Sequence, residues 1–274
     1  MVPRLLPVAA FLALSLAFLA GLSCRHPGAP AAIDPALASS VPPGTALLGG
    51  VDLDRLRGAP LYAQLPVAAL LQAQALHGAS QILLAVSPAS PGLDVLVLAR
   101  GNFAAPTAGA TLLEPGLAAA GNPDSIRAAA AQRRTGRSGA PDLVARAASL
   151  APESQVWAVA RGGVALPLGG NAANLNRILR ATEWATLAAR VDSAIHLQAA
   201  GACSTAEGAR QLEESVRALL SLAAVSLARE PDLAALVRSV GVSRDNLAVR
   251  ATLDVPPAQA AKLLDRFGPF PPPR

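Results

Sequence analysis

Two short apolar segments place the strongest constraint on the fold. QILLAVS at 81–87 and LDVLVLAR at 93–100 are separated by the turn-forming residues PASPG. Apolar segments around a proline and glycine turn predict an antiparallel hairpin. Because both faces of these segments are apolar, we expect central strands of a sheet that helices cover on at least one face.

Two later segments alternate between apolar and polar residues. VDSAIHLQA at 191–199 places Ile195 and Leu197 on one face and His196 on the other, and NLAVRATLDV at 246–255 alternates in the same way. Such a pattern indicates strands with one wetter face. Shorter apolar segments at 46–52 and 155–161 predict two further strands.

Helices are expected between these strands. STAE at 204–207 has the pattern of a capping box, with Ser204 as the expected cap. Apolar residues then recur at helical spacing, and Glu213 stands four residues before Arg217. This pattern predicts a helix from 205 to about 229, which ends before Pro231. Shorter helices are predicted at 54–75, 123–134, 141–149, 172–188, 232–239 and 257–266.

The order of these elements suggests an internal duplication. The segments that begin at Pro42 and Ala151 each pass from a proline turn into an apolar strand and then into a leucine-rich helix. We therefore expect an α+β fold with an antiparallel or mixed sheet, helices packed on it, and two related α/β units that share the sheet. The predicted units are residues 44–150 and 151–267, followed by a proline-rich tail at 268–274.

The amino-terminal residues have the pattern of a secretory signal. Arg4 precedes an uncharged apolar stretch from Leu5 to Leu22, and the small residues Gly21 and Ser23 stand just before Cys24. A positive start, an apolar middle and small residues at the end predict export and cleavage after Ser23, which makes residues 1–23 a signal peptide. Residues 24–43 are rich in Ala and Pro without hydrophobic periodicity, which predicts a tether.

The sequence GLSC at 21–24 resembles the lipobox of bacterial lipoprotein precursors, in which Ser23 and Cys24 match the last small residue and the modified cysteine. The resemblance covers only this amino-terminal region. It implies that Cys24 is the site of lipid attachment. It also implies that the mature protein is anchored to a membrane of the bacterial cell envelope, facing the periplasm or the exterior.

Two other fates of Cys24 remain open. In a plainly secreted protein, Cys24 could form a disulfide with Cys203, the only other cysteine, because an exported chain enters an oxidising compartment. Alternatively, the apolar stretch from Leu5 to Leu22 is just long enough to cross a hydrocarbon layer of ~30 Å as an uncleaved signal anchor.

The sequence contains no catalytic or metal-binding motif. HExxH, CxxC and GxSxG are absent, and the glycine-rich segment at 160–171 lacks the phosphate-loop pattern. We therefore predict no catalytic residue, no cofactor-binding residue, no cofactor and no metal ligand. His196 shares its strand face with Asp192 and Gln198, and we interpret it as a partly exposed surface histidine.

Charge and aromatic content argue against nucleic-acid binding. Without Arg4, the mature chain has 22 basic and 18 acidic residues, and its only basic cluster is Arg133, Arg134 and Arg137. We interpret this cluster as the solvated end of a helix. Only six aromatic residues follow the signal, too few to suggest a platform for stacking bases.

These observations predict an exported, lipid-anchored envelope protein with a binding, scaffolding or assembly role. Its expected partners are a membrane, through the lipid or signal anchor, and another envelope protein. An exported hydrolase with catalytic groups distant in sequence is the alternative hypothesis. A deep pocket at His196 with a serine or carboxylate in reach would favour the hydrolase, whereas a shallow apolar patch would favour a partner site.

Overall fold

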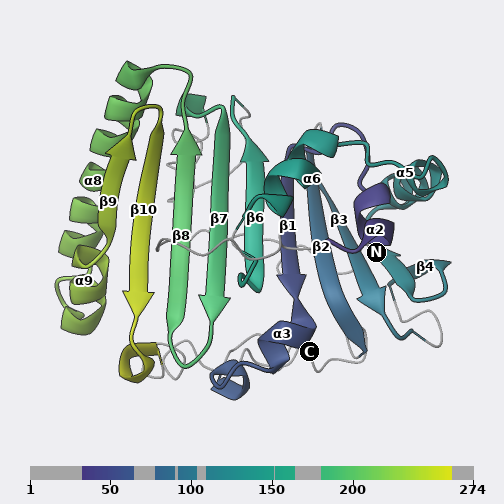
Figure 1. Cartoon of the computed structure of the whole chain (residues 1–274), viewed down its shortest axis with the longest axis horizontal. Helices are drawn as coiled ribbons and strands as arrows, with labels where there is room; N and C mark the ends of the chain where they lie inside the picture. The colour runs from purple at the N-terminus through teal and green to yellow at the C-terminus, as the bar shows by residue number, and fades with distance from the viewer. Residues whose placement is uncertain are drawn as a thin grey trace.

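The computed structural model describes residues 33–64, 78–89, 92–103, 109–150, 152–163 and 180–260. Ten strands in this part of the chain form one antiparallel sheet (Figure 1), in the order β4-β5-β3-β2-β1-β6-β7-β8-β10-β9. They are β1 (Leu47–Asp52), β2 (Ala79–Pro88), β3 (Leu93–Gly101), β4 (Thr111–Glu114), β5 (Leu117–Ala120), β6 (Val156–Arg161), β7 (Trp184–Val191), β8 (Ile195–Ala202), β9 (Gly241–Asp245) and β10 (Ala248–Val255).

The strand order is repeated in the two halves of the sheet. From the centre outward, the first half runs β1, β2, β3, β5, β4 and the second runs β6, β7, β8, β10, β9. In each half, the central strand (β1 or β6) is followed by a hairpin (β2–β3 or β7–β8) that pairs beside it. A later hairpin (β4–β5 or β9–β10) then adds the two outermost strands, and the second strand of that hairpin, β5 or β10, is the one that pairs with the rest of the sheet. The halves meet where β1 pairs with β6. The α+β fold class is therefore confirmed, while the division of the chain at residue 150 stays a prediction.

Most of the described helices have the start signals found in the sequence. Asn122 caps α5 by accepting a hydrogen bond from the amide of Ser125. The capping box predicted at 204–207 is shifted by one residue: Thr205, not Ser204, caps α8 by accepting from the amide of Gly208, and Glu207 pairs with Arg210. Proline begins four helices, as its fixed φ favours. The helices are α2 (Pro35–Ser39), α3 (Leu53–Arg57), α5 (Pro123–Arg134), α6 (Pro141–Ala148), α8 (Ala206–Ser226) and α9 (Pro231–Arg238), with a 3-10 turn η1 at Tyr62–Gln64.

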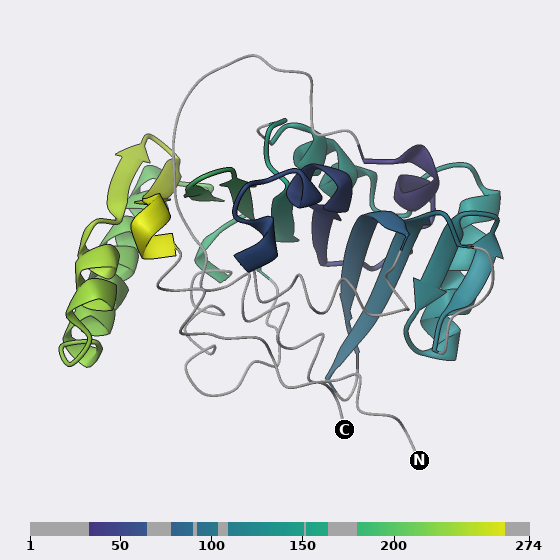
Figure 2. The ribbon, with the colours of Figure 1, turned by 90° about the horizontal axis from the view of Figure 1, so that it is seen from below.

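These helices cover different parts of the sheet. α2 and α5 lie over one face of the first half, α6 lies over β1 and β6 where the halves meet, and α8 and α9 lie at the far edge beside β9 (Figures 1 and 2). None of the described helices is long and apolar enough to cross a membrane.

The larger core fills the space between the helices α2, α5 and α6 and the sheet below them, from β5 across to β6. Leu48 and Leu98 of the sheet are fully buried against Leu37 of α2 and Leu143 of α6. A second core forms on the opposite face, where α3 contributes Leu53 and Leu56 and the second half of the sheet contributes Ile195, Leu197 and Leu253. Strands that bury residues on both faces explain why the hairpin at 81–100 is apolar throughout.

The ion pair between α6 and the end of β6 holds this helix on the sheet. Arg161 donates to both carboxylate oxygens of Asp142, at 2.8 and 2.6 Å, and to the carbonyl oxygen of Thr45 at 2.7 Å. The hydrogen bond from Arg161 lowers the pKa of Asp142 below its ordinary value. The same strand end therefore fixes both a helix and the loop that enters β1.

The folded part of the chain begins earlier than the sequence predicted. Residues up to 43 were expected to form a tether, but α2 packs into the first core, with Leu37 and Val41 buried. Asp34 caps this short helix by accepting from the amides of Ala36 and Leu37, and Pro35 occupies its first turn. Five residues are too few to show helical periodicity in sequence, which explains why the segment resembled a linker.

The helix predicted at 172–188 is wrong over its final residues, because β7 begins at Trp184, and residues 172–179 lie outside the described residues. The sequence WATLAARV contains good helix formers, but pairing with β6 on one side and β8 on the other outweighs that weak preference. The strand predicted at 191–199 begins only at Ile195, since residues 192–194 turn the chain between β7 and β8.

Other predicted elements are confirmed in part. The helices expected at 123–134, 141–149, 205–229 and 232–239 correspond to α5, α6, α8 and α9. The helix expected at 54–75 is shorter, because α3 ends at Arg57, and residues 65–75 lie outside the described residues. The helix expected at 257–266 is seen over 257–260, and its remainder also lies outside them. The short strands β4, β5 and β9 were not predicted.

A glycine at the junction of the two halves makes room for a tryptophan. Gly50 of β1 lies directly opposite Trp157 of β6, and a Cβ atom at Gly50 would overlap the indole ring. Trp157 is only 5% exposed and packs into the first core although it comes from the second half. At the neighbouring Gly49, a Cβ would meet its nearest atom at 3.6 Å, an ordinary contact.

We therefore expect Gly50→Ala to lower the free energy of unfolding by about 1–3 kcal/mol, because the added methyl group forces the indole to move. Gly49→Ala is the matched control and should be neutral or stabilising by up to ~1 kcal/mol, since alanine restricts the unfolded chain. Urea titration of both variants measures the difference. Equal losses for the two variants would contradict the proposed packing of Trp157.

Candidate functional site

His196 lies in a row of charged residues on the wetter face of the second half of the sheet. Strand register places it opposite Arg190 of β7 and Asp254 of β10. Its Nδ1 atom is 2.5 Å from Oδ1 of Asp254, and its Nε2 atom is 3.4 Å from Oδ2 of Asp192. Arg190 lies 3.4 Å from the same oxygen of Asp192. The sequence identified Asp192 as a neighbour but missed Asp254, because the register with β10 was not known.

The geometry of His196 suits a cross-strand contact. A histidine that activates a serine or cysteine keeps one ring nitrogen directed at that nucleophile. Here both nitrogens face carboxylates, and within the described part of the chain no serine or cysteine side chain contacts the ring. Among the same residues, no group of three His, Cys, Asp or Glu side chains is arranged to hold a metal ion.

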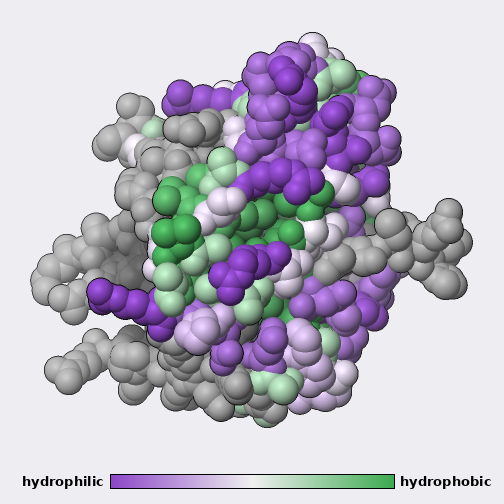
Figure 3. Space-filling view, turned by 90° about the vertical axis from the view of Figure 1, so that its left-hand side faces the viewer, coloured by the Kyte–Doolittle hydropathy of each residue, from purple (hydrophilic) through white to green (hydrophobic). Residues whose placement is uncertain are grey.

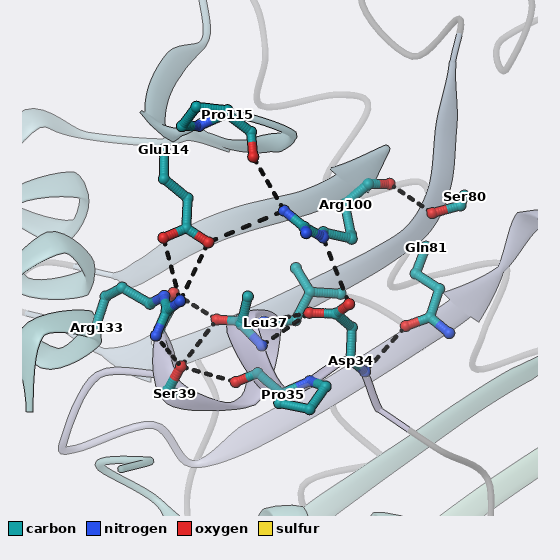
Figure 4. A network of polar contacts seen from close by, with 12 residues as sticks. Asp34, Pro35, Leu37, Ser39, Ser80, Gln81, Arg100, Glu114, Pro115 and Arg133 are labelled. Carbon is teal, nitrogen blue, oxygen red and sulfur yellow. Dashed lines mark hydrogen bonds and ion pairs between the residues drawn. The ribbon is translucent and has the colours of Figure 1, made fainter. Parts of the chain in front are cut away.

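A second polar cluster fastens α2 to the first half of the sheet (Figure 4). Arg133 of α5 donates to both oxygens of Glu114 at 3.2 and 3.1 Å, and to the hydroxyl of Ser39 at 3.3 Å. Arg100 of β3 is 3.4 Å from the carboxylate of Asp34, the residue that caps α2. These contacts join four elements and explain how the beginning of the folded region is held.

The arginine cluster predicted at the end of α5 is therefore divided in the structure. Arg133 is half-buried in the polar cluster around Glu114, whereas Arg134 and Arg137 are exposed. The interpretation as a solvated helix end applies to these two exposed residues only. Arg133 has a structural role, which could not be read from the sequence because its partner lies on a strand that was not predicted.

Within the described residues, Cys203 forms no disulfide; it is 3% exposed, in a small core with Ala209, Leu212 and Val249. Burial, with a smaller contribution from the charge of Glu183, raises the pKa of this thiol above its ordinary value. Such a cysteine is a poor nucleophile. Cys24, the predicted site of lipid attachment, lies outside the described residues.

The most distinctive surface is an apolar patch on α8. From Ala218 to Ala228 the chain contains no charged residue. Leu222 is 62% exposed and Val225 is 72% exposed. Figure 3 views the side of the molecule formed by α8, α9 and β9, and it shows a patch of apolar surface with hydrophilic residues around it. We call the exposed residues Ala218, Ser221, Leu222 and Val225 the α8 patch.

The inner face of α8 buries few large side chains. Leu219 and Leu220, in the middle of the helix, are only half-buried, and the buried residues are Ala209, Leu212 and Ala224. Because the helix lies along the sheet edge, it buries little surface in its second half. The apolar residues that remain outside form the α8 patch.

Comparisons with known proteins leave the family of this chain open. No protein-family model matches it, and the search of curated proteins also found no match. Among solved structures, crystal form I of TP0453 aligns with a TM-score of 0.48 and 11% identity, over 86% of this chain and 98% of the other. Crystal form III of TP0453 aligns with a TM-score of 0.47 and 9% identity, over 86% and 99%. Likeness at this level carries no information about function.

The contacts of His196 predict only a small effect of its replacement. The imidazole, Asp192 and Asp254 are 25%, 41% and 54% exposed, and exposed ion pairs contribute little because water screens them. We expect His196→Gln to lower the free energy of unfolding by less than ~1 kcal/mol. A loss above ~2 kcal/mol in a denaturant titration would show that the charged row is a major support of the sheet.

Proposed function

We propose that this protein is an exported, lipid-anchored component of the bacterial cell envelope, with a binding or scaffolding role carried out by the α8 patch. The observation that supports the binding role is the exposure of Leu222 and Val225 on a helix segment without charges. Large apolar side chains that cluster on a surface mark sites of interaction.

The position of the patch is compatible with a protein held at one end. In the proposed arrangement, the lipid at Cys24 and the residues after it connect the membrane to the folded body that begins near α2. That region belongs to the first half of the sheet, where the polar cluster around Glu114 fastens it. The α8 patch lies at the opposite edge of the same sheet. A protein anchored at one edge can therefore present a binding surface at the other.

The alternative of an exported hydrolase gains no support from His196. Its two nitrogens are engaged by Asp254 and Asp192, and burial makes Cys203 a poor nucleophile. We therefore retain the binding role as the proposed function.

The test is isolation of the native protein from envelope membranes, followed by intact-mass measurement. We expect a chain that starts at Cys24 and carries acyl chains, because several acyl chains give stable anchoring whereas one is marginal. Cys24→Ser should abolish the acylation and release the protein from the membrane fraction or leave an unprocessed precursor. A processed chain without acyl mass would contradict the anchor and favour secretion, and an intact full-length chain would favour a signal anchor.

The same preparation tests the binding role. Partners that copurify with the wild-type protein should be lost with Val225→Glu, which adds a charge at a site that is already exposed. Ala206→Glu adds the same charge in the exposed first turn of α8 and serves as the matched control. Identical copurification from both variants would contradict a role for the patch.

A further inference from the structure

The α8 patch belongs to a stripe that runs along the outer face of the helix. At 100° per residue, Glu214, Ala218, Ser221, Leu222 and Val225 of α8 fall within an arc of about 100°. The buried residues Ala209 and Leu212 lie on the opposite side of the helix, toward the sheet. The exposed positions 214, 218, 221 and 225 are spaced by four, three and four residues, as in helix pairs packed through a heptad seam.

The stripe is complementary to itself when one copy is reversed. Two α8 helices can pack antiparallel about a two-fold axis that passes between Ser221 and Leu222. Each residue of one copy then faces the residue of the other copy that lies equally far from this point on its other side. Ala218 then faces Val225, and Ser221 faces Leu222. A small side chain thus lies opposite a large one in each layer, which allows close packing of the helices.

The charges at the two ends of the stripe match in the same arrangement. Glu214 lies about 11 Å along the helix axis from the central point, at 1.5 Å per residue. Arg229 lies in the turn that directly follows the other end of α8. Reversal therefore brings Glu214 of one copy to the helix end of the other copy, where Arg229 lies. The carboxylate of Glu214 is 64% exposed and has only a distant contact, 3.7 Å, with Arg210. It is therefore available for this pairing.

We infer that the partner of the α8 patch is a second copy of this chain, and that two molecules associate through antiparallel α8 helices with Ala218 opposite Val225. This inference rests on the proposed use of the patch as a binding surface. It adds the identity of the partner and the register of the contact. A two-fold contact of this kind uses the same patch on both copies, as most homodimers do.

The test is disulfide cross-linking in intact cells with two versions of the full-length protein that carry tags of different size. One version carries Ala218→Cys and the other carries Val225→Cys. Cys203 is buried, so it should not interfere. We expect the mixed pair to form a two-chain product under mild oxidation, because facing positions bring the two Cα atoms within the ~7 Å that a disulfide requires.

Each variant expressed alone should yield at least about 10-fold less product. Two copies of residue 218 are separated by ~10 Å along the helix axis, as are two copies of residue 225, and this is too far for a disulfide. Replacing Ala218→Cys with Ala206→Cys in the mixed pair provides the matched control. Glu214→Arg should weaken cross-linking, and the further change Arg229→Glu in the same chain should restore it.

Three results would overturn the inference. These are the absence of a mixed product, equal products from the single variants, or equal product with Ala206→Cys. If no mixed product forms but other proteins copurify in a manner that depends on Val225, the patch binds a different protein and the proposed function stands. If vesicles of anionic phospholipid bind the wild-type protein and not Val225→Glu, the occupant is a lipid surface. If neither binding depends on Val225, the binding role fails as well.

Discussion

The pairing of β1 with β6 is the interaction on which the rest of the structure depends. It joins two halves that have the same strand order, and the missing side chain at Gly50 lets the indole of Trp157 cross from the second half into the first core. Gln155, just before β6, extends the same junction, because its backbone carbonyl oxygen accepts from the amide of Asp52 in β1 at 2.7 Å. Its buried side-chain amide exchanges hydrogen bonds of 2.8 and 2.7 Å with the backbone of Val191 in β7. One continuous sheet results instead of two separate domains.

A continuous sheet separates the two ends of the molecule. Its first half holds α2, where the described fold begins. The apolar core and the polar contacts of Arg133 and Arg100 fasten this helix. Its second half ends at β9, where Arg217 of α8 donates to the carbonyl oxygen of Val242 and Arg244 pairs with Glu213. These contacts hold α8 against the edge strand, where Arg217 satisfies one of its carbonyl groups. They also leave the α8 patch exposed for a specific contact.

The sequence predicted the elements whose signals are local. Helices α5 and α8 have clear caps, and β2 and β3 are apolar segments around a proline turn, so their positions follow from the chain alone. β7 could not be recognised because alanine and leucine favour helices, and only its pairing with β6 and β8 makes it a strand. The contact between His196 and Asp254 and the exposed stripe of α8 depend on register and on packing against neighbours, which local patterns do not contain.

Native-state hydrogen exchange, followed peptide by peptide on the protein purified in detergent, tests most directly whether the two halves form one cooperative unit. If β1 and β6 hold them together, the amides of both strands should exchange only through global unfolding, with the same free energy as denaturant unfolding of the whole protein. The outer strands β4 and β9 should open at lower cost. Exchange of β6, β7 and β8 together at a distinctly lower free energy than β1, β2 and β3 would show that the halves unfold independently, and would contradict the central role of this junction.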